Sequence, residues 1–171
     1  MWPADILMIY GSDRGRFYEL NKRSVTNLNC CGPFIKTIMT RCIHCTRCVR
    51  FVNEVSAIFD FGVIGRGSNM EIGTYISNFI SDELLANVID LCPVGALTSM
   101  PSAFNIRSWE LKYIQSIDVL DSIGSGIKIA VSSNNIIRII PSLDEVYHEY
   151  ITNKARFIFD HLISKDYIIL N

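Results

Sequence analysis

Four cysteines of the sequence have the residue type and spacing of a metal-binding set. Cys42, Cys45 and Cys48 follow the pattern C-x2-C-x2-C, and Cys92 stands 44 positions after Cys48, directly before Pro93. Three closely spaced thiolates can converge on one metal centre from a single loop, and a remote cysteine followed by proline can supply the fourth corner. The pattern predicts one [4Fe-4S] cluster with Cys42, Cys45, Cys48 and Cys92 as its ligands.

Zinc is the main alternative for a site made of four thiolates. Structural zinc sites usually present their cysteines as two separated C-x2-C pairs, whereas the grouping here is three plus one. That grouping suits a cluster, whose corners lie farther apart than the ligands of one ion. Spacing alone therefore favours iron–sulfur and leaves zinc open, with a redox dithiol as a minor alternative. A second cluster is not expected, because the positions of a second triplet before Cys92 hold Asp82, Leu85 and Val88.

Charged and titratable side chains lie beside the thiols in the sequence. His44 stands inside the triplet, but four thiols already complete a ligand set, so we expect this imidazole beside the metal site or at the surface. Arg41, Arg47 and Arg50 flank the cysteines. Positive charge near an anionic cluster favours its reduced form and raises its potential. The alternative, that these arginines are solvated or pair with neighbouring subunits, carries equal weight.

The composition bounds the classes of function. Hydrophobic residues make up 49% of the 171 residues and charged residues 19%, with a formal net charge of -1. So apolar a chain is expected to bury surface against partners, and it has no basic excess for nucleic acid. No apolar run reaches the roughly eighteen residues of a membrane span. No acid–base or nucleophilic constellation is visible, so no catalytic residue is expected. Cys30 and Cys31 are adjacent and are expected to be free thiols.

Periodicity and turn residues predict the elements around Cys42, Cys45 and Cys48. Apolar residues from Val49 to Ile58 fit a short amphipathic helix that leaves the cysteine loop. Gly62, Gly65 and Gly67 predict a turn after this helix. The polar stretch at residues 11–23 is expected to be an ordered loop, because it has neither helical nor strand periodicity.

Further patterns predict how the fourth thiol and the second half of the chain are built. Residues 69–80 are expected to form a strand pair, and residues 82–91 a helix that Ser81 caps and that delivers Cys92. Alternation and turn chemistry predict a hairpin from residues 127–131 and 136–140, stopped by Pro141. The apolar tail at residues 157–170 is expected to be buried in a neighbouring chain.

Several segments together resemble one known family. They are MTRCIHCTRCVRF at residues 39–51, GRG at 65–67, GTY at 73–75 and DLCPVGALTS at 90–99, with further similarity from residue 11 to residue 157. This set is similar to the large iron–sulfur subunits of respiratory complex I, the 75 kDa subunits of NADH:ubiquinone oxidoreductase. The resemblance implies an α+β fold. It implies a ferredoxin-like [4Fe-4S] domain over residues 1–104 and the start of a molybdopterin-oxidoreductase-like domain, with the hairpin, over residues 105–171.

The chain also departs from that family. The family subunits begin with a [2Fe-2S] domain and a further [4Fe-4S] set of one histidine and three cysteines, and this sequence starts about where that set ends. The simplest expectation is the middle piece of a split gene, with separately encoded chains that complete the subunit. Loss of the upstream clusters is the alternative. Frequent isoleucine and asparagine, and an amino terminus without features of a signal or transit peptide, are what an organellar gene would produce.

The resemblance implies an electron-transfer function. The cluster would relay electrons from NADH and flavin towards ubiquinone, in a subunit of the H+-translocating NADH:ubiquinone reductase. Implied partners are the flavin-bearing subunit and other complex I subunits, in the matrix-side peripheral arm at the mitochondrial inner membrane. Two alternatives are a structural scaffold with zinc or a non-conducting cluster, and a hydrogenase-like relative. The similarity beyond the cysteine loop argues against the hydrogenase-like relative.

Overall fold

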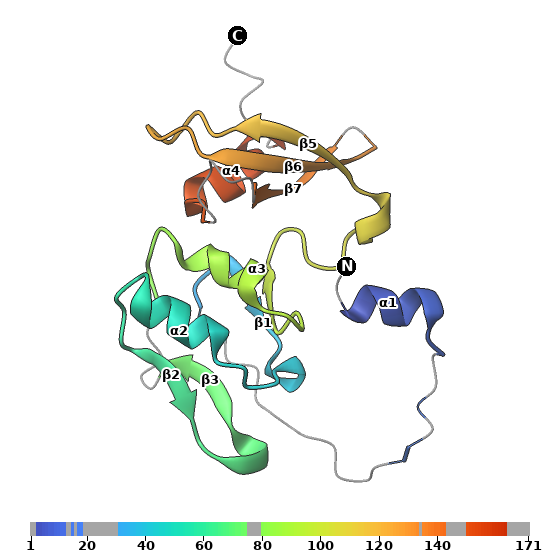
Figure 1. The fold of residues 1–171 in the computed structure, drawn as a ribbon, viewed down its shortest axis with the longest axis vertical. Helices are drawn as coiled ribbons and strands as arrows, with labels where there is room; N and C mark the ends of the chain where they lie inside the picture. Colours follow the sequence, from blue (N-terminus) through green and yellow to red (C-terminus); the bar gives the residue numbers. More distant parts are fainter. Residues whose placement is uncertain are drawn as a thin grey trace. The chain divides into compact units, whose positions relative to one another are not determined.

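A computed structural model of the chain describes residues 3–12, 15, 17–18, 31–74, 80–133, 135–142 and 150–163. The chain divides into two compact units, Met1–Ala103 (unit 1) and Phe104–Asn171 (unit 2). Both units combine helices with antiparallel strands, so the fold is mixed α and β, as expected (Figure 1). None of the helices in the described ranges is long and apolar enough to cross a membrane.

Unit 1 consists of short helices and two small antiparallel sheets. One sheet pairs β1 with β4, and the other pairs β2 with β3. Its elements in chain order are α1 (Pro3–Tyr10), β1 (Ile35–Thr37), the 3-10 helix η1 (Met39–Arg41), α2 (Arg47–Glu54), β2 (Phe61–Ile64), η2 (Gly67–Asn69), β3 (Glu71–Thr74), η3 (Leu85–Asn87), α3 (Val88–Leu91) and β4 (Leu97–Ser99).

The β1–β4 sheet joins two segments that are far apart in the sequence. Ile35 stands opposite Ser99, and Thr37 opposite Leu97. The main-chain bonds Ile38 N to Ala96 O (2.7 Å) and Met100 N to Phe34 O (2.8 Å) extend the pairing at both ends. All four candidate ligands lie between β1 and β4, so this pairing brings the start of the cysteine loop next to the segment after Cys92.

The interior of unit 1 is built from apolar side chains of several elements. Helix α2 packs against α3 and β2. The largest fully buried apolar side chains are Ile35, Met39, Val52, Phe61 and Val88. Removing such side chains from water is the main favourable contribution to folding, at about 25 cal/mol per Å² of apolar surface. The cysteine loop is therefore attached to a packed interior.

The helix after the cysteine loop is shorter than the periodicity predicts. It runs over Arg47–Glu54, where the sequence indicated residues 49–58. After Val55 the chain folds back, and the Ile58 amide donates to the Val52 carbonyl at 3.1 Å. Ala57 has a positive φ of 54°, which no α-helix accommodates. Ile58 therefore packs beside the helix end instead of continuing the helix.

One strand of the pair predicted within residues 69–80 lies in the described part of the chain. It is β3, whose described partner is β2, with Phe61 opposite Thr74 and Gly62 opposite Gly73. Gly62 was expected in a turn, but it lies within a strand, because an isolated glycine weakens a strand without forbidding it. Gly65 and Gly67 do form the turn, with φ of 77° and 64°. Residues 75–79 lie outside the described part.

The segment before Cys92 also differs from the prediction. Helical structure begins at Leu85, and its two pieces end at Leu91. Ser81 does not cap it; instead the Asp82 carboxylate accepts a hydrogen bond from the Leu84 amide at 3.2 Å. The helix does deliver Cys92, whose amide donates to the Val88 carbonyl at 3.1 Å.

In its described residues, unit 2 consists of a three-stranded sheet, a 3-10 helix and an α-helix. Its elements are η4 (Ser108–Glu110), β5 (Lys112–Ile117), β6 (Gly126–Ser132), β7 (Asn135–Pro141) and α4 (Asn153–Ile163). The predicted hairpin is confirmed as β6 and β7, with Ile127 opposite Pro141 and Ile129 opposite Ile139. Strand β5 was not predicted, because all six of its residues are exposed and it lacks a buried face to give a pattern.

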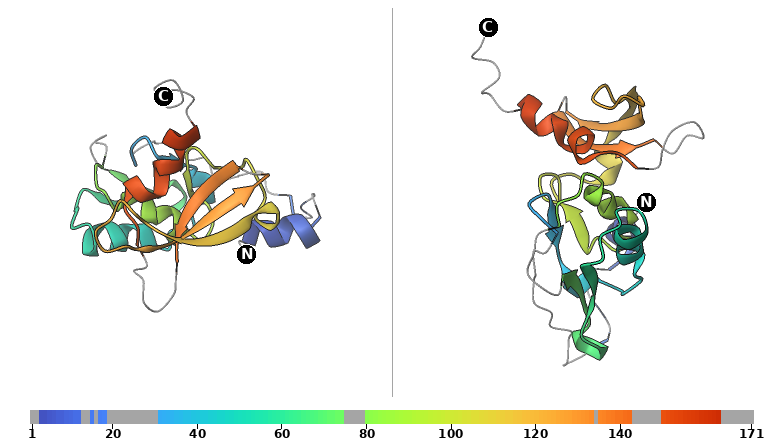
Figure 2. Two further views of the ribbon diagram at one scale, coloured as in Figure 1. Left: turned by 90° about the horizontal axis from the view of Figure 1, so that it is seen from above. Right: turned by 90° about the vertical axis from the view of Figure 1, so that its left-hand side faces the viewer.

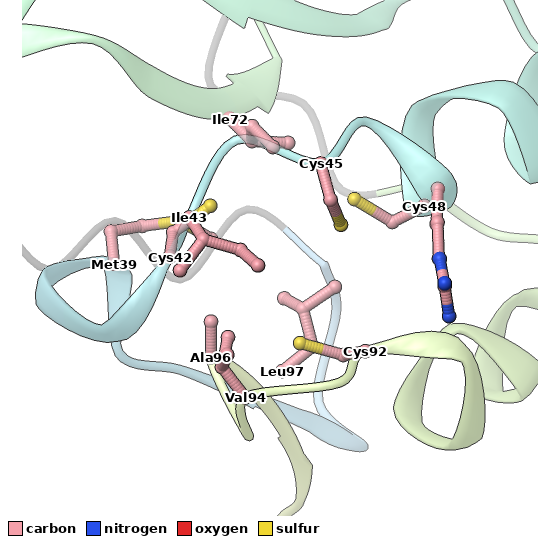
Figure 3. Close-up of a pocket in the computed structure, with 11 residues that line it drawn as sticks. Met39, Cys42, Ile43, Cys45, Cys48, Ile72, Cys92, Val94, Ala96 and Leu97 are labelled. Atoms are coloured by element: carbon pink, nitrogen blue, oxygen red, sulfur yellow. The ribbon is translucent and has the colours of Figure 1, made fainter.

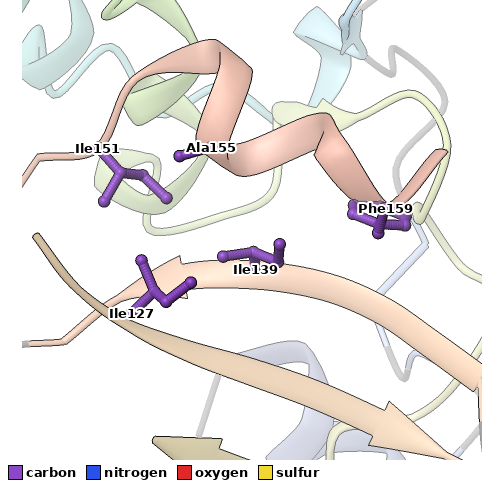
Figure 4. Close-up of a cluster of buried hydrophobic side chains, with 5 residues drawn as sticks. All are labelled: Ile127, Ile139, Ile151, Ala155 and Phe159. Carbon is purple, nitrogen blue, oxygen red and sulfur yellow. The ribbon is translucent and has the colours of Figure 1, made fainter. Parts of the chain in front are cut away.

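Helix α4 covers one face of this sheet (Figure 2). Figure 4 shows Ile151, Ala155 and Phe159 facing Ile127 and Ile139 of the strands, and all five side chains are buried. The apolar tail was expected to be buried in a neighbouring chain. Its first part is instead helical and packs on the chain's own sheet, whereas residues 164–170 lie outside the described part.

Candidate metal centre

The four predicted ligand thiols line one pocket of unit 1 (Figure 3). The sulfur atoms of Cys45, Cys48 and Cys92 are turned towards the same hollow. The pocket is lined by Met39, Cys42, Ile43, Cys45, Arg47, Cys48, Ile72, Cys92, Val94, Ala96 and Leu97. Apart from Arg47, these side chains are thiols or apolar groups, so the pocket offers sulfur donors and little else to a bound group.

The loop from Cys42 to Cys48 owes its shape to backbone conformations that are uncommon for L-residues. Cys42 follows η1 directly, and its amide donates to the Met39 carbonyl at 3.0 Å. His44 and Thr46 both have left-handed backbones, with φ of 55° and 59°. Each such conformation costs roughly 1–2 kcal/mol. These bends wrap the loop so that Cys48 enters the first turn of α2 while Cys42 and Cys45 line the same pocket.

The fourth thiol is held by regular structure on both sides. Cys92 follows the last residue of α3 and is buried. Gly95, with φ of 66°, then turns the chain into β4, and buried Ala96 and Leu97 form the pocket wall. Because β4 pairs with β1, the position of Cys92 is tied to the start of the triplet loop.

Burial and neighbouring sulfurs act on the Cys48 thiol. Burial raises the pKa of Cys48 to about 12; the Val49 amide lowers it, and Cys42, Cys92 and Cys45 raise it further. A buried thiolate beside other sulfurs is costly because its charge is poorly solvated and meets like charge. A metal group removes this cost, since a coordinating thiol gives up its proton outright.

Backbone and side-chain donors surround the triplet. The His44 amide donates to the Cys42 sulfur at 3.4 Å, and its ring Nε2 lies 2.8 Å from the Met70 carbonyl oxygen. Within the described ranges, no three or more His, Cys, Asp or Glu side chains are gathered so that they could hold a metal ion as they stand. The four thiols therefore line a shared pocket without forming a closed ion site as they stand.

The remaining residues singled out from the sequence fall in different places. Arg41, Arg47 and Arg50 are all exposed; Arg47 lines the pocket, and the other two do not. Cys31 is buried, forms no disulfide and does not line the pocket, and Cys30 lies outside the described part. Ile72 was missed: it comes from β3, is 2% exposed, and reaches the pocket only through the β2–β3 hairpin. The strand at residues 71–74 was expected, and the missing signal was its pairing with residues 61–64.

Family models match most of the two units. The model for the ferredoxin-like domain of NADH-quinone oxidoreductase subunit 3 matches residues 32–98, which contain all four thiols of the pocket. The model for the 4Fe-4S domain of NADH-ubiquinone oxidoreductase NDSU1/NuoG-like proteins matches residues 111–160. No cysteine occurs in that second stretch.

Curated relatives match over nearly the whole chain. The NADH-ubiquinone oxidoreductase 75 kDa subunit of Reclinomonas americana is 58% identical over 159 residues, 92% of this chain and 23% of the relative. That of Acanthamoeba castellanii is 59% identical over 91% of this chain and 23% of the relative. The mitochondrial NADH dehydrogenase [ubiquinone] iron-sulfur protein 1 of Solanum tuberosum is 54% identical over 92% of this chain and 21% of the relative.

The chain thus spans between a fifth and a quarter of the length of these relatives. Identity of more than half across both units, together with the ferredoxin-like match over the thiol pocket, leads to one assignment. The chain belongs to the family of the 75 kDa iron–sulfur subunit of NADH-ubiquinone oxidoreductase.

Proposed function

We propose that Cys42, Cys45, Cys48 and Cys92 hold one [4Fe-4S] cluster, and that the chain relays electrons from NADH and flavin towards ubiquinone within NADH:ubiquinone oxidoreductase. One observation carries this proposal: thiols from two segments, 44 positions apart, line one pocket with apolar walls. When bound, such a cluster supplies a redox centre whose potential depends on charge, hydrogen bonds to sulfur and solvent exposure.

The residues of the pocket fit such a group. Four thiols match its ligand number, and Ile72, Val94 and Leu97 give the pocket apolar walls. The amides of His44 and Val49 donate to the sulfurs of Cys42 and Cys48, which stabilises negative charge there. The chain's part in electron transfer is therefore to hold the ligands, keep the site dry and set its potential.

The proposal is restricted to one cluster and assigns unit 2 a structural part. Six cysteines occur in the chain, and none follows Cys92. The second family match, at residues 111–160, therefore has no thiol with which to ligate iron. We assign residues 1–104 to the ferredoxin-like domain and residues 105–171, with the β6–β7 hairpin, to the beginning of a molybdopterin-oxidoreductase-like domain that acts as a scaffold.

The electron path requires other chains. The relatives are named as subunits of NADH-ubiquinone oxidoreductase, and the potato protein is named as mitochondrial. The partners in this proposal are the flavin-bearing subunit, separately encoded chains that complete a 75 kDa-type subunit, and further complex I subunits. The location is the matrix-side peripheral arm at the inner membrane. The chain contributes no catalytic side chain, and the H+-translocating reductase activity belongs to the assembly.

Iron content and one pair of variants test the ligand assignment. Anomalous scattering just above and below the iron edge, on the purified assembly, is expected to show iron between the four thiols. Cys45→Ser is expected to abolish or convert the cluster signal in electron paramagnetic resonance (EPR). Cys31→Ala is the matched control, because Cys31 is a buried cysteine that forms no disulfide and does not line the pocket, and it is expected to keep the signal.

Two results would count against the proposal. Zinc at the four thiols would make the chain a scaffold, since zinc has no redox chemistry. A normal reduced-cluster signal in Cys45→Ser would show that the ligand set is wrong.

A further inference from the structure

The residue between the first two thiols is held in an unusual way. His44 has a left-handed backbone, with φ of 55°, and its amide donates to the Cys42 sulfur at 3.4 Å. For residues other than glycine this conformation costs roughly 1–2 kcal/mol, so it persists only where their surroundings hold them in it. The direction of the His44 amide therefore depends on whatever fixes the backbone at this position.

The imidazole of His44 provides such a restraint. Its Nε2 lies 2.8 Å from the carbonyl oxygen of Met70, 26 positions later. A carbonyl oxygen only accepts hydrogen bonds, so Nε2 carries the proton and donates it. The side chain of a residue in the cysteine loop is thereby tied to the backbone of the β2–β3 hairpin.

The accepting carbonyl belongs to a well-fixed part of that hairpin. The Met70 amide donates to the Gly67 carbonyl at 3.3 Å, which closes the turn. Gly65 permits this turn, because its φ is 77° and a Cβ there would lie 2.9 Å from the Asn69 carbonyl oxygen. Two residues after Met70, Ile72 is 2% exposed and lines the thiol pocket. The hairpin is thus both a wall of the pocket and the anchor of His44.

We propose that His44 is a positioning residue for the metal centre: its ring bond to Met70 holds the left-handed backbone, and so aims its amide at the Cys42 sulfur. This inference rests on the proposed cluster. An N–H group that donates to a ligating sulfur stabilises the more negative, reduced form. The tie to Met70 therefore raises the reduction potential, although the imidazole itself is no ligand.

Two substitutions of His44 separate the ring bond from the bulk of the side chain. His44→Leu removes the donor, and His44→Gln keeps an N–H group at a similar reach. The test is an EPR-monitored redox titration of the full chain loaded with iron and sulfide. At a given applied potential, the ratio of oxidised to reduced cluster is expected to be threefold to tenfold higher in His44→Leu than in the unchanged protein. A tenfold shift is about 59 mV for a one-electron couple. His44→Gln is expected to stay within twofold of the unchanged protein.

Thr98→Val is the matched control within unit 1. It also removes one side-chain bond to a backbone carbonyl, from Thr98 to Lys36 at 3.4 Å, but Thr98 does not line the pocket. Its potential is expected to equal that of the unchanged protein. An unchanged potential in His44→Leu with an intact cluster would overturn the positioning role. Failure of the unchanged chain to form any cluster would instead overturn the proposed function.

A measurement on the unchanged chain covers the case in which His44→Leu does not retain its cluster. The chain has three histidines, so histidine that carries 15N at its amide labels few positions. The labelled chain is then loaded with iron and sulfide. Pulsed EPR of the reduced cluster is expected to show a 15N coupling that disappears in His44→Gln, which has no label at position 44. Absence of the coupling in the unchanged chain would overturn the proposal.

Discussion

Arg47 is the one guanidinium among the residues that line the thiol pocket. It is the first residue of α2 and is exposed, so its charge is partly screened by solvent. Arg50, one turn later on the same helix, is also exposed but does not line the pocket. The two arginines therefore differ in their distance from the site more than in their environment.

Replacing Arg47 by glutamine is expected to lower the reduction potential of the cluster. At a given applied potential, the ratio of oxidised to reduced cluster should rise about threefold. The reason is that loss of a nearby positive charge disfavours the more negative, reduced state. Arg50→Gln is the matched control, and its shift is expected to be smaller. A redox titration of both variants measures this, and equal shifts would show that the place of Arg47 in the pocket wall is immaterial.

Thr46 illustrates strain that the site retains. It has a left-handed backbone, with φ of 59°, and its side chain makes no capping bond to α2. Asparagine tolerates this conformation better than a β-branched residue. Thr46→Asn is expected to raise the free energy of unfolding of the metal-free chain by about 0.5–1 kcal/mol. Chemical denaturation measures the change, with Thr98→Asn as the control in an extended strand, where asparagine should be unfavourable.

Among the elements, the β2–β3 hairpin connects the fold to the site. It presents Ile72 to the pocket and the Met70 carbonyl to His44. Its turn depends on Gly65, whereas Gly62 lies in an extended strand with open space where a Cβ would stand. Position 65 therefore requires glycine, whereas position 62 of the same hairpin has room for a side chain.

Gly65→Ala is expected to lower the free energy of unfolding by about 1–3 kcal/mol, because its Cβ would clash with the Asn69 carbonyl at a positive φ. Gly62→Ala is the control and is expected to be neutral or to stabilise by up to about 1 kcal/mol. Thermal and chemical denaturation of the loaded chain measure both. A Gly65→Ala protein as stable as the unchanged chain would contradict the clash.

These elements also show how far the sequence alone leads. The β6–β7 hairpin was predictable because Ile127, Ile129 and Ile139 alternate around a polar turn. The β2–β3 hairpin was misassigned because Gly62 was interpreted as a breaker, and β5 has no buried face to produce a pattern. Spacing was enough to choose the four thiols that line the pocket. The contact of His44 with Met70 was not predictable, since it depends on tertiary structure 26 positions away.

Across the whole molecule, a cluster at the four thiols would act as a cross-link in unit 1. It would join Cys48 to Cys92 and close a long loop, whereas unit 2 contains no cysteine. The relation used for disulfide loops of this length gives about 4 kcal/mol from restriction of the unfolded chain. Metal binding and folding of unit 1 are therefore coupled.

Removal of the cluster by an iron chelator under reducing conditions is expected to lower the free energy of unfolding of unit 1 by about 4 kcal/mol. The unfolding of unit 2 is expected to be unaffected. Calorimetry of the loaded and stripped chains distinguishes the two transitions when it is combined with fluorescence in a Trp2→Phe background, where Trp109 of unit 2 is the remaining tryptophan. An equal loss of stability in both units would show that they unfold as one body.

The pairing of β1 with β4 has a consequence for the order in which the chain is synthesised. Ile35 leaves the site of synthesis 64 residues before its partner Ser99, and Cys42, Cys45 and Cys48 all appear in that interval. At about 5–20 residues per second, the wait is about 3–13 s. During this time a nascent chain exposes these three candidate ligand thiols and an unpaired strand, so protection of the growing chain from oxidation matters before any metal can be enclosed.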